Sequence, residues 1–345
     1  MPAAAITGLG LVTSLGPDAV TSAAAARAGI TRPEPLALEV DGEPVVGHPA
    51  ATVPAGLEGA DRLLRLVTLA LEDVLWSVPA DVLQTARWLV ALPAPLPAEP
   101  PPPLSGLEDA PVDPQAFHPP ALDADALRGH IEDAVGARLD PDRFEAFAGR
   151  SGAVRALGHA RRHAQERTPC VVMAVDSRVE VARALLAHGR VMAPGDAVGM
   201  QPGEAAGVAV VEPAGGRAAV GLLGTGGLDH EPHHLYSGRP ALGRGLAAAV
   251  PVLEDVWPIT DANGETYRAA EWGGAVRLSP TLRASFERAS YPAADVGDTG
   301  AAAPMVALAL AARAFERGYA PAPTALVLAA DDTGGRGSIA VHAPS

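Results

Sequence analysis

The sequence predicts an α/β protein in which helices form layers around largely parallel sheets. Stretches with a strand pattern alternate with stretches of helical spacing along the whole chain, which is typical of this class. Of the 345 residues, 48% are hydrophobic and 19% are charged, a composition that can bury a sizeable core. The chain ends in two apolar runs that form a hairpin pattern. The length suits two ordinary domains or one large duplicated one.

The expected strands are short apolar runs bounded by glycine or proline. Residues 3–16 open the chain with a strand that breaks at glycines, and residues 170–177 read as a fully buried strand. The remaining strands are expected at residues 87–95, 205–215, 216–227, 256–260, 324–330 and 338–343.

Helices are expected where apolar residues recur three and four positions apart. The first covers residues 17–29, with Pro17 at its start and Gly29 past its end. The others are expected at residues 60–78, 124–135, 152–167, 178–190, 242–254 and 301–317. The order of elements is loosely similar in residues 1–215 and 216–345, which predicts two related halves divided there.

Residues 93–123 are rich in proline and are expected to form neither regular helix nor sheet. The segment is either an extended surface excursion within a domain or a polyproline stretch that binds a partner. We favour the excursion, because no basic or aromatic motif accompanies the prolines.

The charge and cysteine content exclude several classes of function. The net charge of −14 disfavours binding to nucleic acid and to anionic membranes. A single cysteine, Cys170, excludes an internal disulfide and any multi-cysteine metal site. The first residues lack a basic region, and no apolar run approaches a membrane span of about 20 residues. We therefore expect a cytoplasmic protein, and the absence of lysine amid abundant alanine, glycine and proline suggests a bacterial genome rich in G and C.

Several stretches resemble the β-ketoacyl synthases of the thiolase-like fold family. The most specific is GMQPGEAAGVAVVEP at residues 199–213, which is similar to the family's GxxPGEGAGxLVLE segment. Further similar stretches lie at residues 5–16, 224–240, 297–318 and 331–343, so the resemblance spans nearly the whole chain. It implies a five-layered α-β-α-β-α fold of two similar halves, and a dimer.

The resemblance also implies a nucleophile position that this chain does not fill. The family places a cysteine at a helix N-terminus, where the helix dipole favours the thiolate. Its ACxSG turn falls on residues 148–152 here. Matching the Ser-Gly pair puts Gly149 at the cysteine position, whereas counting back without a gap from residue 170 puts Arg150 there. Neither residue can attack a thioester.

The two histidines of the family, which assist decarboxylation and stabilise the enolate, are also replaced. The first falls on Asn263 and the second near Asp298. The family's lysine has no counterpart, since the chain contains none. The resemblance thus predicts a ketosynthase homologue that lacks the catalytic cysteine and lacks both histidines.

Five positions around this vestigial pocket are candidates for any remaining chemistry. Ser151 is either a substitute nucleophile or the residue that caps the following helix, and the cap is favoured because no base lies at short range. Asn263, Glu265, Glu271 and Asp298 are expected to converge there. Glu265 and Asp298 would form either an acid–base pair or a hydrogen-bonded polar pocket.

The close approach of Glu265 and Asp298 would need compensation. Two close carboxylates are costly unless one is protonated or an arginine such as Arg150 or Arg268 pairs with them. An Arg150 guanidinium within hydrogen-bond reach of Asp298 or Glu265 would indicate a sealed, salt-bridged pocket. An open apolar tunnel there would indicate the opposite.

Other chemical motifs are weak. Cys170 begins an apolar strand and reads as a buried core residue. The spacing of His230, His233 and His234 fits no standard zinc motif, so we expect no metal. The glycines of the first strand depart from the dinucleotide fingerprint, and we expect no cofactor.

Two functional hypotheses follow. The first is a non-condensing ketosynthase homologue that acts as a binding, partner or structural subunit in an acyl-chain, polyketide or accessory bacterial system. It would form a homodimer, or a heterodimer with a ketosynthase homologue, with an acyl carrier protein as a further candidate partner. The alternative is an enzyme that handles acyl thioesters, as an acyltransferase, decarboxylase or hydrolase, using Ser151 or the pair Glu265 and Asp298.

Overall fold

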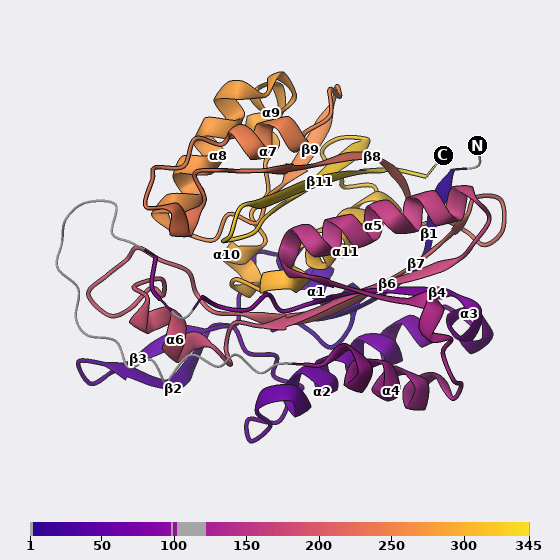
Figure 1. Cartoon of the computed structure of the whole chain (residues 1–345), viewed down its shortest axis with the longest axis horizontal. Coiled ribbons are helices and arrows are strands. Elements are labelled where there is room, and N and C mark those ends of the chain that lie inside the picture. The colour runs from indigo at the N-terminus through magenta and orange to yellow at the C-terminus, as the bar shows by residue number, and fades with distance from the viewer. Residues whose placement is uncertain (1–2, 98, 102–121, 345) are drawn as a thin grey trace.

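The chain folds into five alternating layers of helices and sheet (Figure 1). The structure is a computed structural model that describes residues 3–97, 99–101 and 122–344. α2 and α4 form the lowest layer in Figure 1, α5 and α11 form the middle layer, and α7, α8 and α9 form the uppermost layer. Strands separate these helical layers, as the sequence predicts.

The first part of the chain supplies the two lower helical layers and the sheet between them. Its elements are β1 (Ala4–Val12), α1 (Ala19–Arg27), β2 (Glu34–Val40), β3 (Glu43–Gly47), α2 (Gly59–Leu75), α3 (Ala80–Thr85), β4 (Arg87–Leu92), α4 (Ala124–Val135), β5 (Phe144–Ala148), α5 (Gly149–Gln165), β6 (Cys170–Ser177), α6 (Ala182–Ala187) and β7 (Glu204–Pro213).

The second part supplies the upper sheet, the outer helices and the second helix of the middle layer. Its elements are β8 (Gly221–His230), α7 (Arg244–Ala249), β9 (Val256–Ile259), α8 (Thr266–Leu278), α9 (Pro280–Ser285), α10 (Ala293–Val296), α11 (Ala303–Glu316), β10 (Thr324–Ala330) and β11 (Gly335–His342). Short 3-10 turns precede β5 and α11.

Within the described residues, nine strands form one sheet in the order β5-β4-β6-β7-β1-β8-β11-β10-β9. Read outward from the centre, β1-β7-β6-β4 and β8-β11-β10-β9 follow the same order by position in the chain. They also share directions, with two antiparallel pairings followed by a parallel one. The two halves of the fold are therefore built alike, whereas the division at residue 215 stays a prediction.

The expectation of largely parallel sheets is wrong, because antiparallel pairings dominate the centre of the sheet. Strands that are buried on both faces read as continuous apolar runs whichever way they pair. The composition of a run such as residues 170–177 therefore carries no information about direction.

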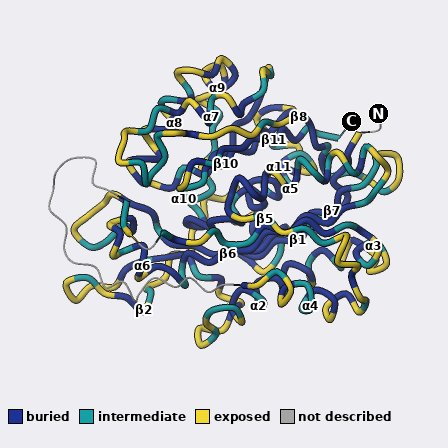
Figure 2. Tube along the Cα trace, in the orientation of Figure 1, coloured by how far each residue is buried: buried dark blue, intermediate teal, exposed yellow. Residues whose placement is uncertain are grey.

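The core explains why β6 is apolar from Cys170 to Val175 and buried along its whole length. Its Cys170, Val172 and Ala174 pack toward α5 and α11, whereas Val171 and Met173 pack toward α2 and α4 on the other face. Figure 2 shows these central strands mostly in the colour of buried residues. The middle layer thus has sheet on both sides, and the start of α5 lies deep in the molecule.

Several elements differ from the expected boundaries. α4 matches its prediction, but α6 and α7 are much shorter than predicted, and α5 begins at Gly149 rather than at residue 152. Neither the β2–β3 hairpin nor α8 is expected from the sequence. The hairpin carries Asp41 and Gly42 at its turn, a strong local signal that the flanking prolines obscure.

Most of the proline-rich segment, residues 93–123, lies outside the described residues, so its expected role as an excursion stays a prediction. Among the helices that the structure describes, none is long and apolar enough to cross a membrane.

Candidate functional site

The start of α5 is built on a glycine and held by an aspartate. Gly149 has a φ of +74°, and a Cβ added there would lie 2.5 Å from Oδ1 of Asp331. The backbone N–H of Arg150 donates to the same Oδ1 at 2.7 Å, and the Ser151 hydroxyl donates to the other carboxylate oxygen. The N-terminus of α5, which favours anions, therefore already holds an internal carboxylate.

The expectation that Ser151 caps α5 is wrong. The N-cap is Ala148, which makes no side-chain cap, and Ser151 lies inside the first helical turn. Asp331, from the loop after β10, accepts the first N–H groups instead. A side chain distant in sequence has replaced the local cap.

The Arg150 side chain fills the space beside this turn. It is 2% exposed. Its Nη2 donates to both oxygens of Asp298 at 2.6 and 2.7 Å, and its Nη1 donates to Oδ2 of Asp261 at 3.2 Å. Asp261 follows β9, and Asp298 immediately follows α10. The guanidinium thus lies within hydrogen-bond reach of Asp298, the arrangement expected of a sealed pocket.

Asn263 joins the two candidate carboxylates. Its Nδ2 donates to Glu265 at 2.9 Å and to Asp298 at 2.5 Å, and its Oδ1 accepts from the Glu265 backbone N–H at 3.2 Å. Glu265 also accepts from Nε and Nη2 of Arg190, at 2.7 and 3.1 Å. Each carboxylate has its own arginine and a shared amide donor, so the two have no need to share a proton.

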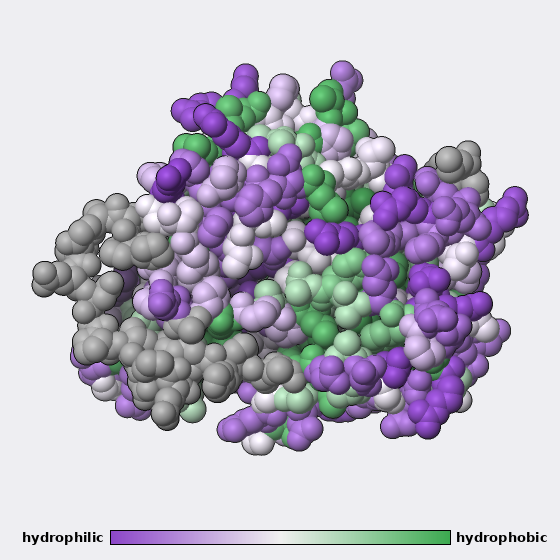
Figure 3. Space-filling view, viewed as in Figure 1, coloured by the Kyte–Doolittle hydropathy of each residue, from purple (hydrophilic) through white to green (hydrophobic). Residues whose placement is uncertain are grey.

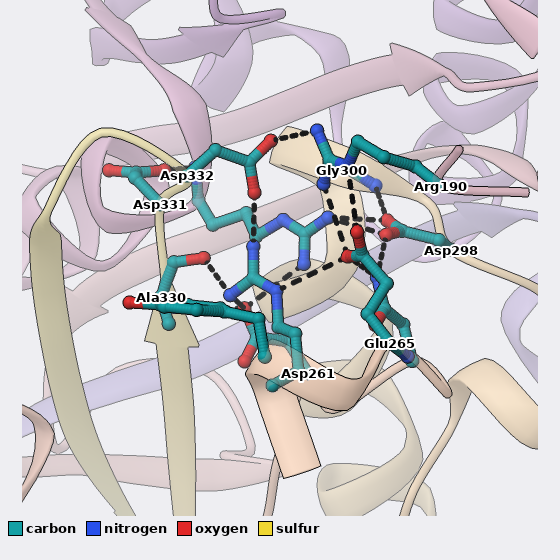
Figure 4. Close-up of polar contacts among 12 residues, drawn as sticks. Arg190, Asp261, Glu265, Asp298, Gly300, Ala330, Asp331 and Asp332 are labelled. Atoms are coloured by element: carbon teal, nitrogen blue, oxygen red, sulfur yellow. Dashed lines mark hydrogen bonds and ion pairs between the residues drawn. The ribbon is translucent and has the colours of Figure 1, made fainter. Parts of the chain in front are cut away.

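Asp332 closes the network on the remaining side (Figure 4). It accepts from Nη1 of Arg190 at 2.8 Å and from Nη2 of Arg268 at 2.6 Å. Arg268 also donates to the backbone carbonyl of Ala330. We call Arg150, Arg190, Arg268, Asp261, Asn263, Glu265, Asp298 and Asp332 the charge network.

The charge network keeps Asp298 and Asp332 ionised. Burial alone would raise the pKa of Asp298, but the guanidinium groups of Arg150 and Arg178 outweigh it and hold that pKa well below the ordinary value. The pKa of Asp332 is also lowered, because Arg190 and Arg268 outweigh its burial. A carboxylate that is ionised and engaged by arginine is a poor proton donor at neutral pH.

Glu271 does not join the other candidates. It lies later on α8, and its carboxylate accepts from Nε of Arg336 at 2.6 Å. Nη2 of Arg336 also donates to the Tyr267 hydroxyl at 2.9 Å. Burial raises the pKa of Glu271 despite this partner. The structure thus places Gly149, Arg150, Ser151, Asn263, Glu265 and Asp298 around one site and Glu271 at a separate ion pair.

No acyl-sized cavity opens beside Arg150 within the described part of the chain. The space next to its side chain measures about 20 Å³ and is lined by Asp261, Asp298 and Val306, room for about one water molecule. A wider groove of about 410 Å³ lies outside it, lined by Asn263, Trp272 and neighbouring residues. The charge network lies between this groove and the helix start.

The remaining candidate residues, Cys170 and the histidine-rich loop after β8, make contacts that stabilise the fold. Cys170 lies buried on β6, and burial raises the pKa of its thiol to about 12, so the reactive thiolate is disfavoured. Glu231 accepts backbone N–H groups from His233 and Gly245. Across residues 3–97, 99–101 and 122–344, no three His, Cys, Asp or Glu side chains are grouped to hold a metal.

Four residues of the site escaped the sequence analysis: Asp261, Asp331, Asp332 and Arg190. A usable signal existed, because Asp261 and Asp331 each stand just after a buried strand, where β9 and β10 run parallel and end at the same edge. Side chains at such strand ends meet in space. Arg190 carries no comparable signal, since its position depends on a loop.

Comparisons with known proteins bear on the fold. No family model and no curated protein matches the sequence. Solved structures, in contrast, match over nearly the whole chain. A chain from a type II polyketide synthase acyl-carrier protein in complex with its ketosynthase bound to the hexaketide is 12% identical, with a TM-score of 0.74 over 100% of both chains. The ishigamide ketosynthase/chain length factor is 21% identical, with a TM-score of 0.67 over 99% of this chain and 100% of that one.

A Streptomyces albus JA3453 oxazolomycin ketosynthase domain is 14% identical, with a TM-score of 0.71 over 99% of this chain and 75% of that one. The chain has the thiolase-like fold of the ketosynthases. The five-layered fold expected from the sequence motifs is therefore confirmed. At these identities the likeness concerns the fold and not the chemistry of the site.

The lowered acid pKa values predict a dependence of stability on pH. A carboxylate whose folded pKa is depressed contributes stability above its unfolded pKa, about 3.9 for aspartate, and loses it as the pH falls toward the folded pKa. The free energy of unfolding should thus fall steeply below about pH 4. Asp298→Asn should flatten this decline by up to about 1.4 kcal/mol per pH unit.

Urea unfolding between pH 7 and pH 2 measures this slope. Asp41→Asn is the matched control, because Asp41 lies exposed at the β2–β3 turn and asparagine tolerates its φ of +53°. A decline of equal steepness in Asp298→Asn and the wild type would show that Asp298 is not held ionised.

Proposed function

We propose that this protein is a non-condensing ketosynthase-like subunit that acts by binding a partner rather than by forming acyl intermediates. The observation that carries the proposal is the Arg150 side chain at the start of α5. It is buried and bonded to Asp298 and Asp261, where a condensing enzyme of this fold needs an open thiol. The 20 Å³ cavity beside it leaves no room for an acyl chain.

The proposed identity of the lost residues rests on the sequence motifs. Gly149 or Arg150 stands for the cysteine, Asn263 for one histidine and Asp298 for the other. The side chains now present neutralise one another, which supports a site that has exchanged its reactive groups for internal ion pairs. Such exchanges preserve a fold while removing its chemistry.

The partner that we propose is a second chain of the same fold, either another copy or a ketosynthase homologue. The similar ketosynthase/chain length factor is named as such a combination, and the similar type II ketosynthase is held in a complex with its acyl-carrier protein. We propose an acyl-chain or polyketide system as the setting for this chain. An acyl carrier protein is a further candidate partner.

The edge of β5 is the surface that we propose for this contact. β5 ends the nine-stranded sheet of the described residues and pairs there with β4 alone. Ala146 is exposed between the partly buried Glu145 and Phe147, and Ala148 is exposed at the end of the strand. Four of the five residues of β5 are apolar. Figure 3 shows apolar surface over this part of the molecule. An exposed apolar edge strand is a ready template for pairing with another strand.

Ala146→Arg should therefore weaken assembly. A charged side chain in the middle of a paired edge would have to be desolvated, so we expect the dimer to dissociate at least tenfold more readily. Light scattering after gel filtration measures the mass. Ala24→Arg, at an exposed position on α1, is the control. Equal dimer stability in both variants would remove β5 as the interface.

The alternative function, acyl-thioester turnover by Ser151 or by Glu265 and Asp298, finds less support. The Ser151 hydroxyl donates to Asp331, but no histidine among the described residues is hydrogen-bonded to either, and both carboxylates of the pair are engaged by arginines. Product analysis after incubation with acyl- and malonyl-carrier-protein thioesters tests this directly. We expect neither hydrolysis nor release of carbon dioxide above the protein-free rate. Turnover that disappears in Ser151→Ala or Glu265→Gln would overturn the proposed function.

A further inference from the structure

A second pocket lies apart from the charge network, against the edge strand β9. It measures about 140 Å³ and lies among β9, α1, α11 and the segment at residues 290–295. Its lining includes Arg27, Trp257, Tyr291, Asp295 and Tyr319. The volume is below the roughly 300–1,000 Å³ of pockets for drug-sized ligands, so the pocket suits a small molecule.

The aromatic wall is held in place by the fold. The Trp257 indole N–H donates to the Ser290 hydroxyl at 2.8 Å. The backbone of Ser290 continues the sheet beside β9, with its N–H donating to Pro258 and its carbonyl accepting from Thr260. The Tyr291 hydroxyl accepts from Trp272 at 3.0 Å. These bonds fix the shape of the pocket before any ligand arrives.

Two opposite charges line this pocket, the exposed Arg27 and the half-buried Asp295. The Asp295 side chain makes no hydrogen bond or ion pair with any residue that the structure describes, and burial raises its pKa. The Arg27 guanidinium lies 4.2 Å from the centre of the Tyr319 ring and has no carboxylate partner among the same residues. Desolvating a carboxylate is costly unless a cation or hydrogen-bond donor compensates.

We propose that this pocket binds a small zwitterion of the α-amino acid class, with its ammonium on Asp295 and its carboxylate on Arg27. The apolar part of the ligand would pack against Trp257 and Tyr319. A simple amine would satisfy only Asp295, and a simple acid only Arg27. The site is independent of the proposed function, because its lining omits Arg150, Asp298 and the rest of the charge network.

The test compares ligands that differ by one charge. Glycine, alanine, valine and leucine are titrated by calorimetry and by NMR shift perturbation, alongside 3-methylbutylamine and 4-methylpentanoate, which lack one charged group of leucine. We expect at least one amino acid to bind with a Kd of about 1 mM or lower. Leucine or the best binder should exceed both single-charge analogues by at least tenfold.

Variants locate the site. Asp295→Asn and Arg27→Gln should each weaken amino acid binding at least tenfold, whereas the exposed Glu287→Gln and Arg155→Gln should leave it unchanged. Thermal melting confirms that all four variants are folded. No binding by any of the four amino acids at roughly 10 mM would overturn the proposal. Equal binding of 3-methylbutylamine, or binding that survives both pocket substitutions, would also overturn it.

Discussion

Arg150→Ala should lower the free energy of unfolding by about 3–5 kcal/mol, the usual cost of removing one partner from a buried ion pair. The loss follows from what the substitution leaves behind. Asp298 and Asp261 would remain buried without the guanidinium that donates to both. Chemical denaturation at pH 7 measures the effect.

Two further variants are needed to interpret the effect of Arg150→Ala on stability. Arg155→Ala, on an exposed position of the same helix, should change stability by less than about 0.5 kcal/mol. Arg150→Met combined with Asp298→Asn removes the arginine and one orphaned charge, so it should recover at least about 1 kcal/mol relative to Arg150→Met alone. If Arg150→Ala and Arg155→Ala proved equally mild, the buried arginine would not be paired as described.

Asp332→Ala should cost about 3 kcal/mol or more, because it leaves two buried guanidinium groups short of a carboxylate. Arg190 and Arg268 each donate to a different oxygen of Asp332, at 2.8 and 2.6 Å. Glu265 still holds Arg190, and the Ala330 carbonyl still accepts from Arg268, so the protein should remain folded.

The isosteric Asp332→Asn separates charge from shape. It keeps one acceptor oxygen and should cost less than Asp332→Ala but more than the exposed control Glu287→Ala. Thermal melting and urea unfolding of the three variants measure the order. An Asp332→Asn variant as stable as the wild type would show that the carboxylate charge is not needed at that place.

The sequence predicted the layers of this fold better than the directions in which its strands pair. Apolar runs located β6, β9 and β10 closely, because burial on two faces favours apolar residues on both faces of a strand. Whether two strands pair in parallel or antiparallel depends instead on the segments that connect them. α8 was missed because Gly273 and Gly274 interrupt its apolar spacing, so tertiary packing decides its helical state.

For the site, the sequence analysis named five residues of the charge network and missed Arg190, Asp261 and Asp332. Arg150, Asn263, Glu265 and Asp298 could be predicted together because motif resemblance aligns each with a family position. Asp332 has no such match, and the signal for Asp331 is its place just after the buried strand β10. Only the fold shows that Asp331 reaches the start of α5, far away in the sequence. Ion pairs between loops that are distant in the sequence produce no local periodicity from which they could be predicted.

The central claim is that no residue at the start of α5 accepts an acyl group. Intact-mass spectrometry after incubation with acyl- and malonyl-carrier-protein thioesters tests it most directly, with a condensing ketosynthase in parallel as the positive control. We expect this protein to keep its unmodified mass while the control gains the acyl group. A stoichiometric acyl adduct that is lost in Ser151→Ala would contradict it.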